Sequence, residues 1–207
     1  MTDYRNLASE LVAALKRQGA DAADVYITSV DGFNTTVRLG AIEKLQQSTS
    51  KGLGLRVFKN GATALTFTTD FQDKTVKDLV KETLEIVKVS NADKHNGLAP
   101  KEMLGEHTGK LLIFDEEILK LSPEKKIEMA KEAEEAGRAV DKRITNSNGA
   151  SWANSVAQVT LANSDGFVGQ YQTTIASLYV SLLAEENGVK QTDGWYSFNR
   201  FLNKIDS

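Results

Sequence analysis

The sequence contains no cysteine and only two histidines, His95 and His107, among 207 residues. The absence of cysteine excludes disulfide bonds, thiolate zinc sites and a cysteine nucleophile, and it is compatible with a reducing compartment. Neither histidine opens a His-Glu-x-x-His pattern, the spacing that places two imidazoles on one helix face around zinc. Glu106 precedes His107, but this pair alone is typical of a solvated loop. We therefore expect no catalytic, cofactor-binding or metal-binding residue in this chain.

Long apolar runs are also absent. The longest covers residues 11–15, far short of the ~20 residues that span a bilayer, and the N-terminus has no apolar signal core. The net charge is −3, from 25 basic and 28 acidic residues, so there is no excess of positive charge for binding phosphates of nucleic acid or an anionic membrane. The sequence predicts a cytoplasmic globular protein without a membrane or nucleic-acid partner.

The first 90 residues show helical spacing at both ends and turn signals between them. A helix is predicted from an N-cap at Thr2 or Asp3 to Gly19 at its end, with an apolar stripe. Turn signals then recur, which predicts an antiparallel meander of about five strands. The signals are Asp31-Gly32, Gly40, Lys51-Gly52 and Asn60-Gly61. A second helix is predicted from about Asp73 to Val89 and should cover the sheet. Its apolar stripe comprises Val76, Leu79, Val80, Thr83, Ile86 and Val87.

The second half of the chain repeats this composition of helix and strands. Ser122 and Pro123 are typical of an N-cap and a first helical position, so a helix begins there. Its buried stripe is predicted to be Met129, Ala130, Ala133, Ala136, Gly137 and Val140. Further hairpins are indicated at Asn148-Gly149, Asp165-Gly166 and Asn187-Gly188. The fold class is α+β with antiparallel sheets, in a domain of residues 1–98 and a second, incomplete domain of residues 99–207.

Three local patterns invite a chemical interpretation. Glu128, Glu132, Glu134 and Glu135 stand among lysines, which favours a solvated helix face over a desolvated acid–base pair. The run Gly52-Leu53-Gly54 lacks the third glycine and the following helix of a dinucleotide loop, so we expect these glycines to admit a neighbouring backbone instead. No Ser-His-Asp arrangement is visible.

Residues 144–184 contain a single charged residue, Asp165. A freely exposed sheet normally carries Lys and Glu on its wet face and edges. Two explanations remain open. The zone is either an interface, whose core is depleted in charge, or a sheet buried on both faces within a larger domain.

Several short runs, in the same order along the chain, resemble TldD/PmbA proteins. They are Ala23 to Tyr26, Val37 to Leu45, Gly52 to Phe58, Thr68 to Phe71, His95 to Leu98, Arg143 to Asn146 and Leu161 to Phe167. The resemblance is to the N-terminal part of the family and is closer to the PmbA (TldE) side. Its members were once described as modulators of DNA gyrase.

The resemblance implies a cytoplasmic zinc-dependent peptidase that trims unfolded peptides, built as a homo- or heterodimer with a TldD-like subunit. In that pairing the TldD-like subunit carries a His-Glu-x-x-x-His motif and a later cysteine. Family subunits are roughly twice as long as this chain, so the zinc is expected in a portion beyond Ser207 or in the partner, and this chain alone is expected to be inactive.

Three functional hypotheses follow. The leading one is a substrate-enclosing and dimer-building portion of such a peptidase. The alternative is a non-enzymatic regulator that contacts DNA gyrase or another protein. The net charge of −3 argues against direct contact with DNA, but not against contact with a protein. The third is an autonomous hydrolase whose site is assembled from scattered residues.

Overall fold

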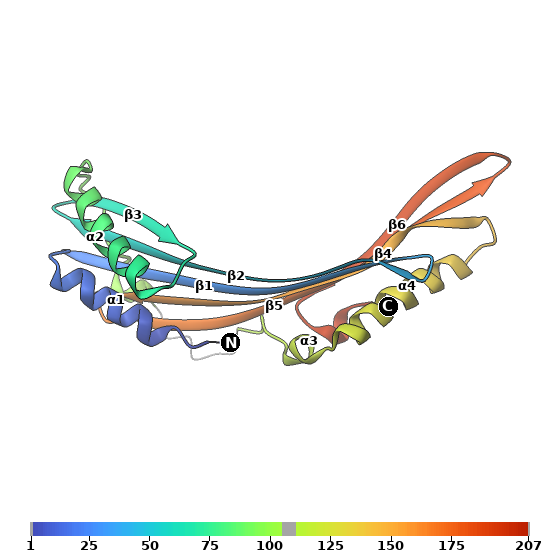
Figure 1. Ribbon diagram of the computed structural model, residues 1–207, viewed down its shortest axis with the longest axis horizontal. Coiled ribbons are helices and arrows are strands. Elements are labelled where there is room, and N and C mark those ends of the chain that lie inside the picture. Colours follow the sequence, from blue (N-terminus) through green and yellow to red (C-terminus); the bar gives the residue numbers. More distant parts are fainter. Residues whose placement is uncertain (1, 105–110, 207) are drawn as a thin grey trace. The chain divides into compact units, whose positions relative to one another are not determined.

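The computed structural model describes residues 2–104 and 111–206. Its six strands form one sheet in the order β3-β2-β1-β4-β5-β6, with antiparallel pairing (Figure 1). The strands are β1 (Ala22–Arg38), β2 (Ala41–Lys59), β3 (Ala62–Thr68), β4 (Ile144–Asn163), β5 (Val168–Glu186) and β6 (Val189–Asn199). The helices are α1 (Arg5–Arg17), α2 (Asp73–Val89), α3 (Glu116–Lys120) and α4 (Pro123–Ala139), with short 3₁₀ turns η1 (Lys101–Met103) and η2 (Leu202–Lys204). The predicted α+β class is confirmed.

Fewer and longer strands are present than the turn signals indicated. Turns with positive φ at both central residues join β1 to β2 at Leu39-Gly40, β2 to β3 at Asn60-Gly61 and β5 to β6 at Asn187-Gly188. The expectation of about five strands in the first 70 residues is wrong, because there are three. Strands continue through Asp31-Gly32, Lys51-Gly52 and Asn148-Gly149, since glycine permits a turn but does not impose one on an otherwise strand-forming run.

The chain forms two compact units, each made of three stretches. The first unit contains residues 2–30, 50–104 and 158–171, and the second contains residues 31–49, 111–157 and 172–206. Each unit combines stretches that are distant in the sequence, so the units do not test the predicted division into domains of residues 1–98 and 99–207. That division stays a prediction.

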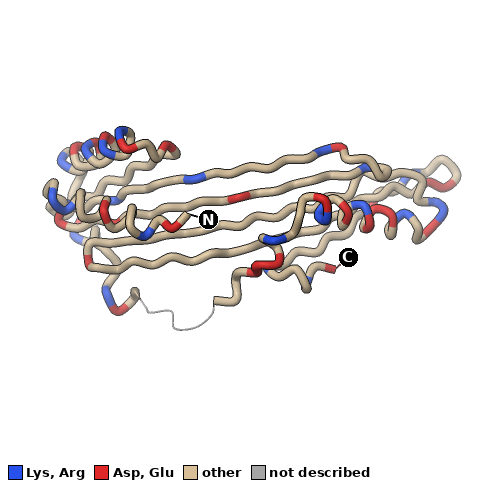
Figure 2. Tube along the Cα trace, turned by 60° about the horizontal axis from the view of Figure 1, so that its bottom comes forward, with Lys and Arg blue, Asp and Glu red and all other residues tan. Residues whose placement is uncertain are grey.

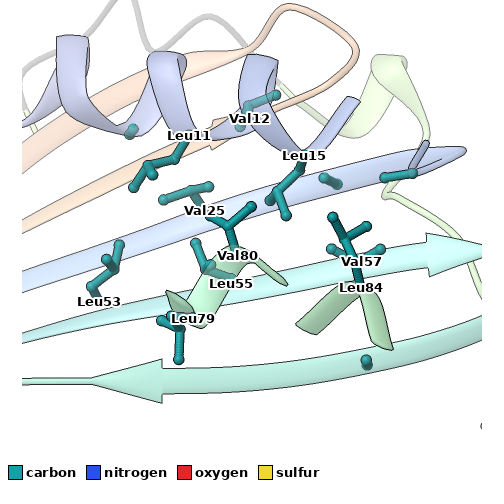
Figure 3. Packing of buried hydrophobic residues seen from close by; sticks show 14 of the residues in the cluster. Leu11, Val12, Leu15, Val25, Leu53, Leu55, Val57, Leu79, Val80 and Leu84 are labelled. Atoms are coloured by element: carbon teal, nitrogen blue, oxygen red, sulfur yellow. The ribbon is translucent and has the colours of Figure 1, made fainter. Parts of the chain in front are cut away.

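In the first unit α1 and α2 cover one face of the sheet. Leu11 and Leu15 from α1 and Leu79 and Val80 from α2 point toward the alternate residues of β1 and β2 (Figure 3). The core residues of these two strands are Ala23, Val25, Ile27, Leu53, Leu55 and Val57. Because successive strand residues face opposite sides, the intervening residues face away from the helices.

The predicted α2 helix is confirmed from Asp73 to Val89. Its buried stripe includes Leu84, whereas the predicted Ile86 is exposed. The expected N-cap was Thr2 or Asp3, but the first helix begins one or two residues later, with Tyr4 as N-cap and no side-chain cap. The Asp3 carboxylate nevertheless accepts a hydrogen bond from the N–H of Arg5. Gly19 follows α1 with a φ of 99°, as predicted for the residue after the cap.

In the second unit α3 and α4 cover a core built around Trp152, which is fully buried and donates a 3.0 Å hydrogen bond to the side-chain oxygen of Asn154. The Ser122 cap is confirmed by its hydrogen bond from the N–H of Lys125. The predicted stripe of α4 is confirmed in part, because Ala130 is buried and Met129 and Ala133 pack half-buried against this core. The buried residues of α4 are Lys126, Ala130 and Glu134, whereas Ala136 and Val140 are exposed.

Candidate functional site

The residues that sequence analysis considered for metal binding do not form a metal centre in the described part of the chain. His95 is exposed, and its backbone N–H donates to the carboxylate of Asp93 at 2.9 Å. Glu106 and His107 lie outside the described residues, so the prediction about that pair stays a prediction. Among residues 2–104 and 111–206 no group of three His, Cys, Asp or Glu side chains is placed to hold a metal ion. The zinc that the resemblance implies therefore does not fit the described residues.

Of the four α4 glutamates considered in the sequence, three lie on the solvated face as expected. Glu128 and Glu132 are exposed and pair with Lys125, and Glu135 is exposed. The assignment of Glu134 to this face is wrong, because its carboxylate is buried against the turn between β1 and β2. Its hydrogen bonds there are structural, so it offers no free base.

A cavity of about 370 Å³ lies on the side of the first unit's sheet that faces away from α1 and α2. We call it the Gly54 groove. It is lined by Asp24, Tyr26, Gly54, Arg56, Leu65, Leu98, Ala99, Leu104, Leu161 and Asn163. The strands β1 to β4 supply its floor and sides, and the segment that follows α2 supplies Leu98, Ala99 and Leu104.

The floor of the groove is open because Gly54 has no side chain. A Cβ atom at this position would lie 3.8 Å from the backbone oxygen of Tyr26 and 3.9 Å from that of Thr66, which is ordinary contact. The expectation that this glycine admits a close neighbouring backbone is therefore wrong. Its role is to leave space above the sheet.

A bidentate ion pair forms the polar end of the groove. Arg56 Nε donates to the two carboxylate oxygens of Asp24 at 3.1 and 3.0 Å, and Nη2 donates to the second oxygen. The Asp24 side chain is only 11% exposed, whereas that of Arg56 is 46% exposed. The guanidinium therefore presents positive charge outward while its carboxylate partner lies beneath it. Among the described residues Nη1 has no hydrogen-bond acceptor.

Two uncharged groups join the ion pair in the groove wall. Asn163 accepts two 3.0 Å hydrogen bonds through Oδ1, from the N–H groups of Asp165 and Phe167. The other polar group of this side chain is its amide Nδ2, which is a hydrogen-bond donor. Burial, and to a smaller extent Tyr171, raises the pKa of Tyr26, so its phenol is neutral at physiological pH. Together with Arg56 these groups make the polar part of the groove rich in hydrogen-bond donors.

The two strands at the ends of the sheet expose large apolar side chains. In the first unit these are Leu65 and Phe67 of β3, and in the second they are Trp195, Tyr196 and Phe198 of β6. Figure 2 shows long stretches of strand without charged residues, whereas the helices carry many of both signs. In β4, which supplies about half of the charge-poor zone, buried residues alternate with half-buried ones, so one face of this strand is covered.

Within the described residues no helix is both long and apolar enough to cross a membrane.

Sequence models of one protein family and several known proteins match this chain. The sequence model of the PmbA/TldA metallopeptidase domain 1 matches residues 23–87, and that of the central domain matches residues 116–206. The metalloprotease PmbA of Escherichia coli O157:H7 is 29% identical over 91% of this chain and 41% of its own length. A PmbA homologue of Haemophilus influenzae is 28% identical over 99% of this chain and 45% of its own length. The chain thus spans less than half the length of these relatives.

Solved structures of known proteins have the same fold as this chain. A Bacteroides thetaiotaomicron protein described as a modulator of DNA gyrase superposes with a TM-score of 0.85 and 25% identity, over 99% of this chain and 47% of that protein. The TldE of Thermococcus kodakarensis has the same fold, with a TM-score of 0.80 and 16% identity over 95% of this chain and 43% of its own. Since two sequence models of one family and these relatives match the same residues in the same order, the chain belongs to the PmbA/TldD family.

Proposed function

We propose that this chain is the substrate-enclosing and dimer-building portion of a zinc-dependent cytoplasmic peptidase that trims unfolded peptides. Its relatives include proteins named metalloprotease PmbA, which supports a peptidase role for the assembly to which it contributes. Because the described residues do not fit a zinc ion, the hydrolytic step is assigned to residues outside them or to a TldD-like partner. This chain's own contribution is to bind and orient peptide.

The observation that carries this proposal is the exposed apolar character of the terminal strands. A strand at the end of a sheet has unpaired backbone N–H and C=O groups, which extended peptides pair with by adding a strand. Backbone hydrogen bonds tolerate any sequence, as trimming of unfolded peptides requires. Trp195 and Tyr196 on β6 add apolar contact area beside such an edge, and Lys and Glu are few along the neighbouring strand β5.

The test uses the purified chain with a fluorescently labelled, denatured polypeptide and with a TldD-like subunit. We expect the polypeptide to bind in fluorescence anisotropy and the two proteins to co-elute in size-exclusion chromatography. A monomer that binds neither would contradict the proposal.

A matched pair of variants separates edge binding from general stickiness. Trp195→Lys places a charge on the terminal strand and should weaken peptide binding about ten-fold, since a charge at an edge opposes strand addition. Val89→Lys replaces a similarly exposed apolar residue at the end of α2 and should leave binding unchanged. Equal losses in both variants would argue against strand addition at β6.

A further inference from the structure

The Gly54 groove combines an open floor, apolar walls and one outward-facing cation. We propose that it binds the carboxyl-terminal residue of an extended peptide, an inference that rests on the proposed function. Arg56 receives the α-carboxylate of that residue, and its apolar side chain lies over Gly54.

The volume and walls of the groove suit one large apolar side chain. Its ~370 Å³ lie at the small end of the range for ligand pockets, which is about 300–1,000 Å³. Leu65, Leu98, Leu104 and Leu161 make its walls apolar. The absence of a side chain at Gly54 leaves space for such a group, since among the described residues a Cβ at this position would have only the two strand oxygens of Tyr26 and Thr66 within 4 Å.

The charge arrangement selects an anion. Asp24 holds the guanidinium through Nε and Nη2, so the orientation of Nη1 is fixed before a ligand arrives. A pre-oriented guanidinium loses little conformational entropy when it binds a carboxylate, and charge-assisted hydrogen bonds of this kind are the strong ones. An α-ammonium group is disfavoured, because it would approach the guanidinium first and because the Asp24 oxygens already accept three hydrogen bonds.

The spacing between the cationic end and the floor matches one residue. Arg56 and Gly54 are two positions apart on one strand and so face the same side, about 7 Å from each other along β2. In the strand register Leu65 lies beside Arg56 and Phe67 beside Gly54, so β3 lines this length with apolar side chains. A terminal residue with its carboxylate at Arg56 can therefore reach Gly54 with its side chain.

The experiment compares two labelled decapeptides that end in leucine, one with a free carboxylate and one with a carboxamide. Binding to the intact chain is measured by fluorescence anisotropy. We expect the carboxylate peptide to bind at least ten-fold more tightly. Arg56→Gln should reduce its affinity to that of the carboxamide peptide and leave the latter unchanged. Gly54→Leu should lower the affinity for the carboxylate peptide by a similar factor, because the new side chain fills the space at the floor of the groove.

Two controls keep the result interpretable. Arg17→Gln removes an exposed arginine from α1, on the other side of the sheet, and should change neither affinity. Arg56→Gln leaves the Asp24 carboxylate unpaired, so the Asp24→Asn/Arg56→Gln double variant, which removes both charges, serves if the single variant does not fold. Equal affinities of the two peptides for the unaltered chain overturn the inference and leave the proposed function standing. Failure of both peptides to bind overturns both.

Discussion

The carboxylate of Glu134, on α4, accepts a 2.8 Å hydrogen bond from the backbone N–H of Gly40 in the turn between β1 and β2. Its other oxygen accepts from the N–H of Leu39 at 2.9 Å. Glu134 is only 2% exposed, so these two bonds replace most of its contact with water. The pair fixes the tip of the β1–β2 hairpin to the helix that covers the second unit.

We expect Glu134→Gln to lower the free energy of unfolding by about 2 kcal/mol, because an amide nitrogen would then face a backbone N–H and leave a buried donor unpaired. Chemical denaturation followed by circular dichroism measures this loss. Glu135→Gln, at the exposed neighbouring position, should change stability by less than about 0.5 kcal/mol. Similar stability of both variants would show that the turn contact contributes little.

The same carboxylate makes stability depend on pH. Burial acts to raise the pKa of Glu134, but hydrogen bonds from Ser147, Gly40 and Leu39 and the charge of Arg138 outweigh it and hold the pKa below its ordinary value. A lowered pKa in the folded state gives stability that is complete above the ordinary glutamate pKa of about 4.3 and is lost as pH falls through the folded pKa. The stability difference between the unaltered chain and Glu134→Gln should therefore shrink below about pH 4, and denaturation curves between neutral and acidic pH measure it. A constant difference would contradict the assignment.

Leu39 adopts a φ of 52°, in the left-handed region that β-turns of this kind require. This conformation costs a leucine about 1 kcal/mol, whereas asparagine tolerates it. Leu39 is exposed, so little burial is lost on replacement. Leu39→Asn should stabilise the protein by about 0.5–1 kcal/mol, measured as a rise in Tm. Asn60→Leu, the reverse change at the matching position of the next hairpin, should lower Tm, and a rise there would refute the reasoning.

Gly149 lies within β4 with a φ of 110°, and an added Cβ would come within 3.0 Å of both the Thr36 side chain and the Val37 backbone oxygen. Gly149→Ala should therefore destabilise the protein by about 1–3 kcal/mol. Gly97→Ala is the control, since its added Cβ meets no atom within 4 Å among the described residues and its φ is not positive. Equal thermal midpoints for the two variants would rule out strain at Gly149.

Thr63 on β3 carries a buried hydroxyl oxygen with no hydrogen-bond partner among the described residues. Thr63→Val removes this polar group at nearly constant shape and should stabilise the fold by about 1 kcal/mol. Thr83 offers a contrast, because its hydroxyl donates to the Leu79 oxygen at 2.7 Å and contacts the Thr66 hydroxyl at 2.6 Å. Thr83→Val should therefore cost about 1–2 kcal/mol, measured in the same denaturation series.

Elements that depend on local signals could be predicted from the sequence. The bounds of α2 and the Ser122 cap follow from periodicity and capping within a few residues, and both are confirmed. The burial of Glu134 on α4 could not be predicted, because its hydrogen-bond partners lie 94 and 95 residues earlier in the chain. Strands that run through Asp31-Gly32 and Asn148-Gly149 depend in the same way on pairing with distant strands.

The groove was missed for a related reason. The sequence Gly52-Leu53-Gly54-Leu55-Arg56 does alternate small or charged residues with buried leucines, which indicates a strand with one open side. Nothing local places Asp24 beneath Arg56, nor Asn163 beside them. These contacts arise only when β1, β2 and β4 pair.

The position of β1 between β2 and β4 also bears on how the chain folds. On one side β1 pairs with β2, which follows it directly in the sequence through the turn at Leu39-Gly40. On its other side lies β4, and there the Thr36 hydroxyl contacts the Ser151 hydroxyl, 115 residues later in the chain. Contacts so distant form slowly, because a long loop must close before they contribute. During synthesis the β1–β2–β3 meander can therefore assemble first, with one side of β1 left unpaired until β4 leaves the ribosome.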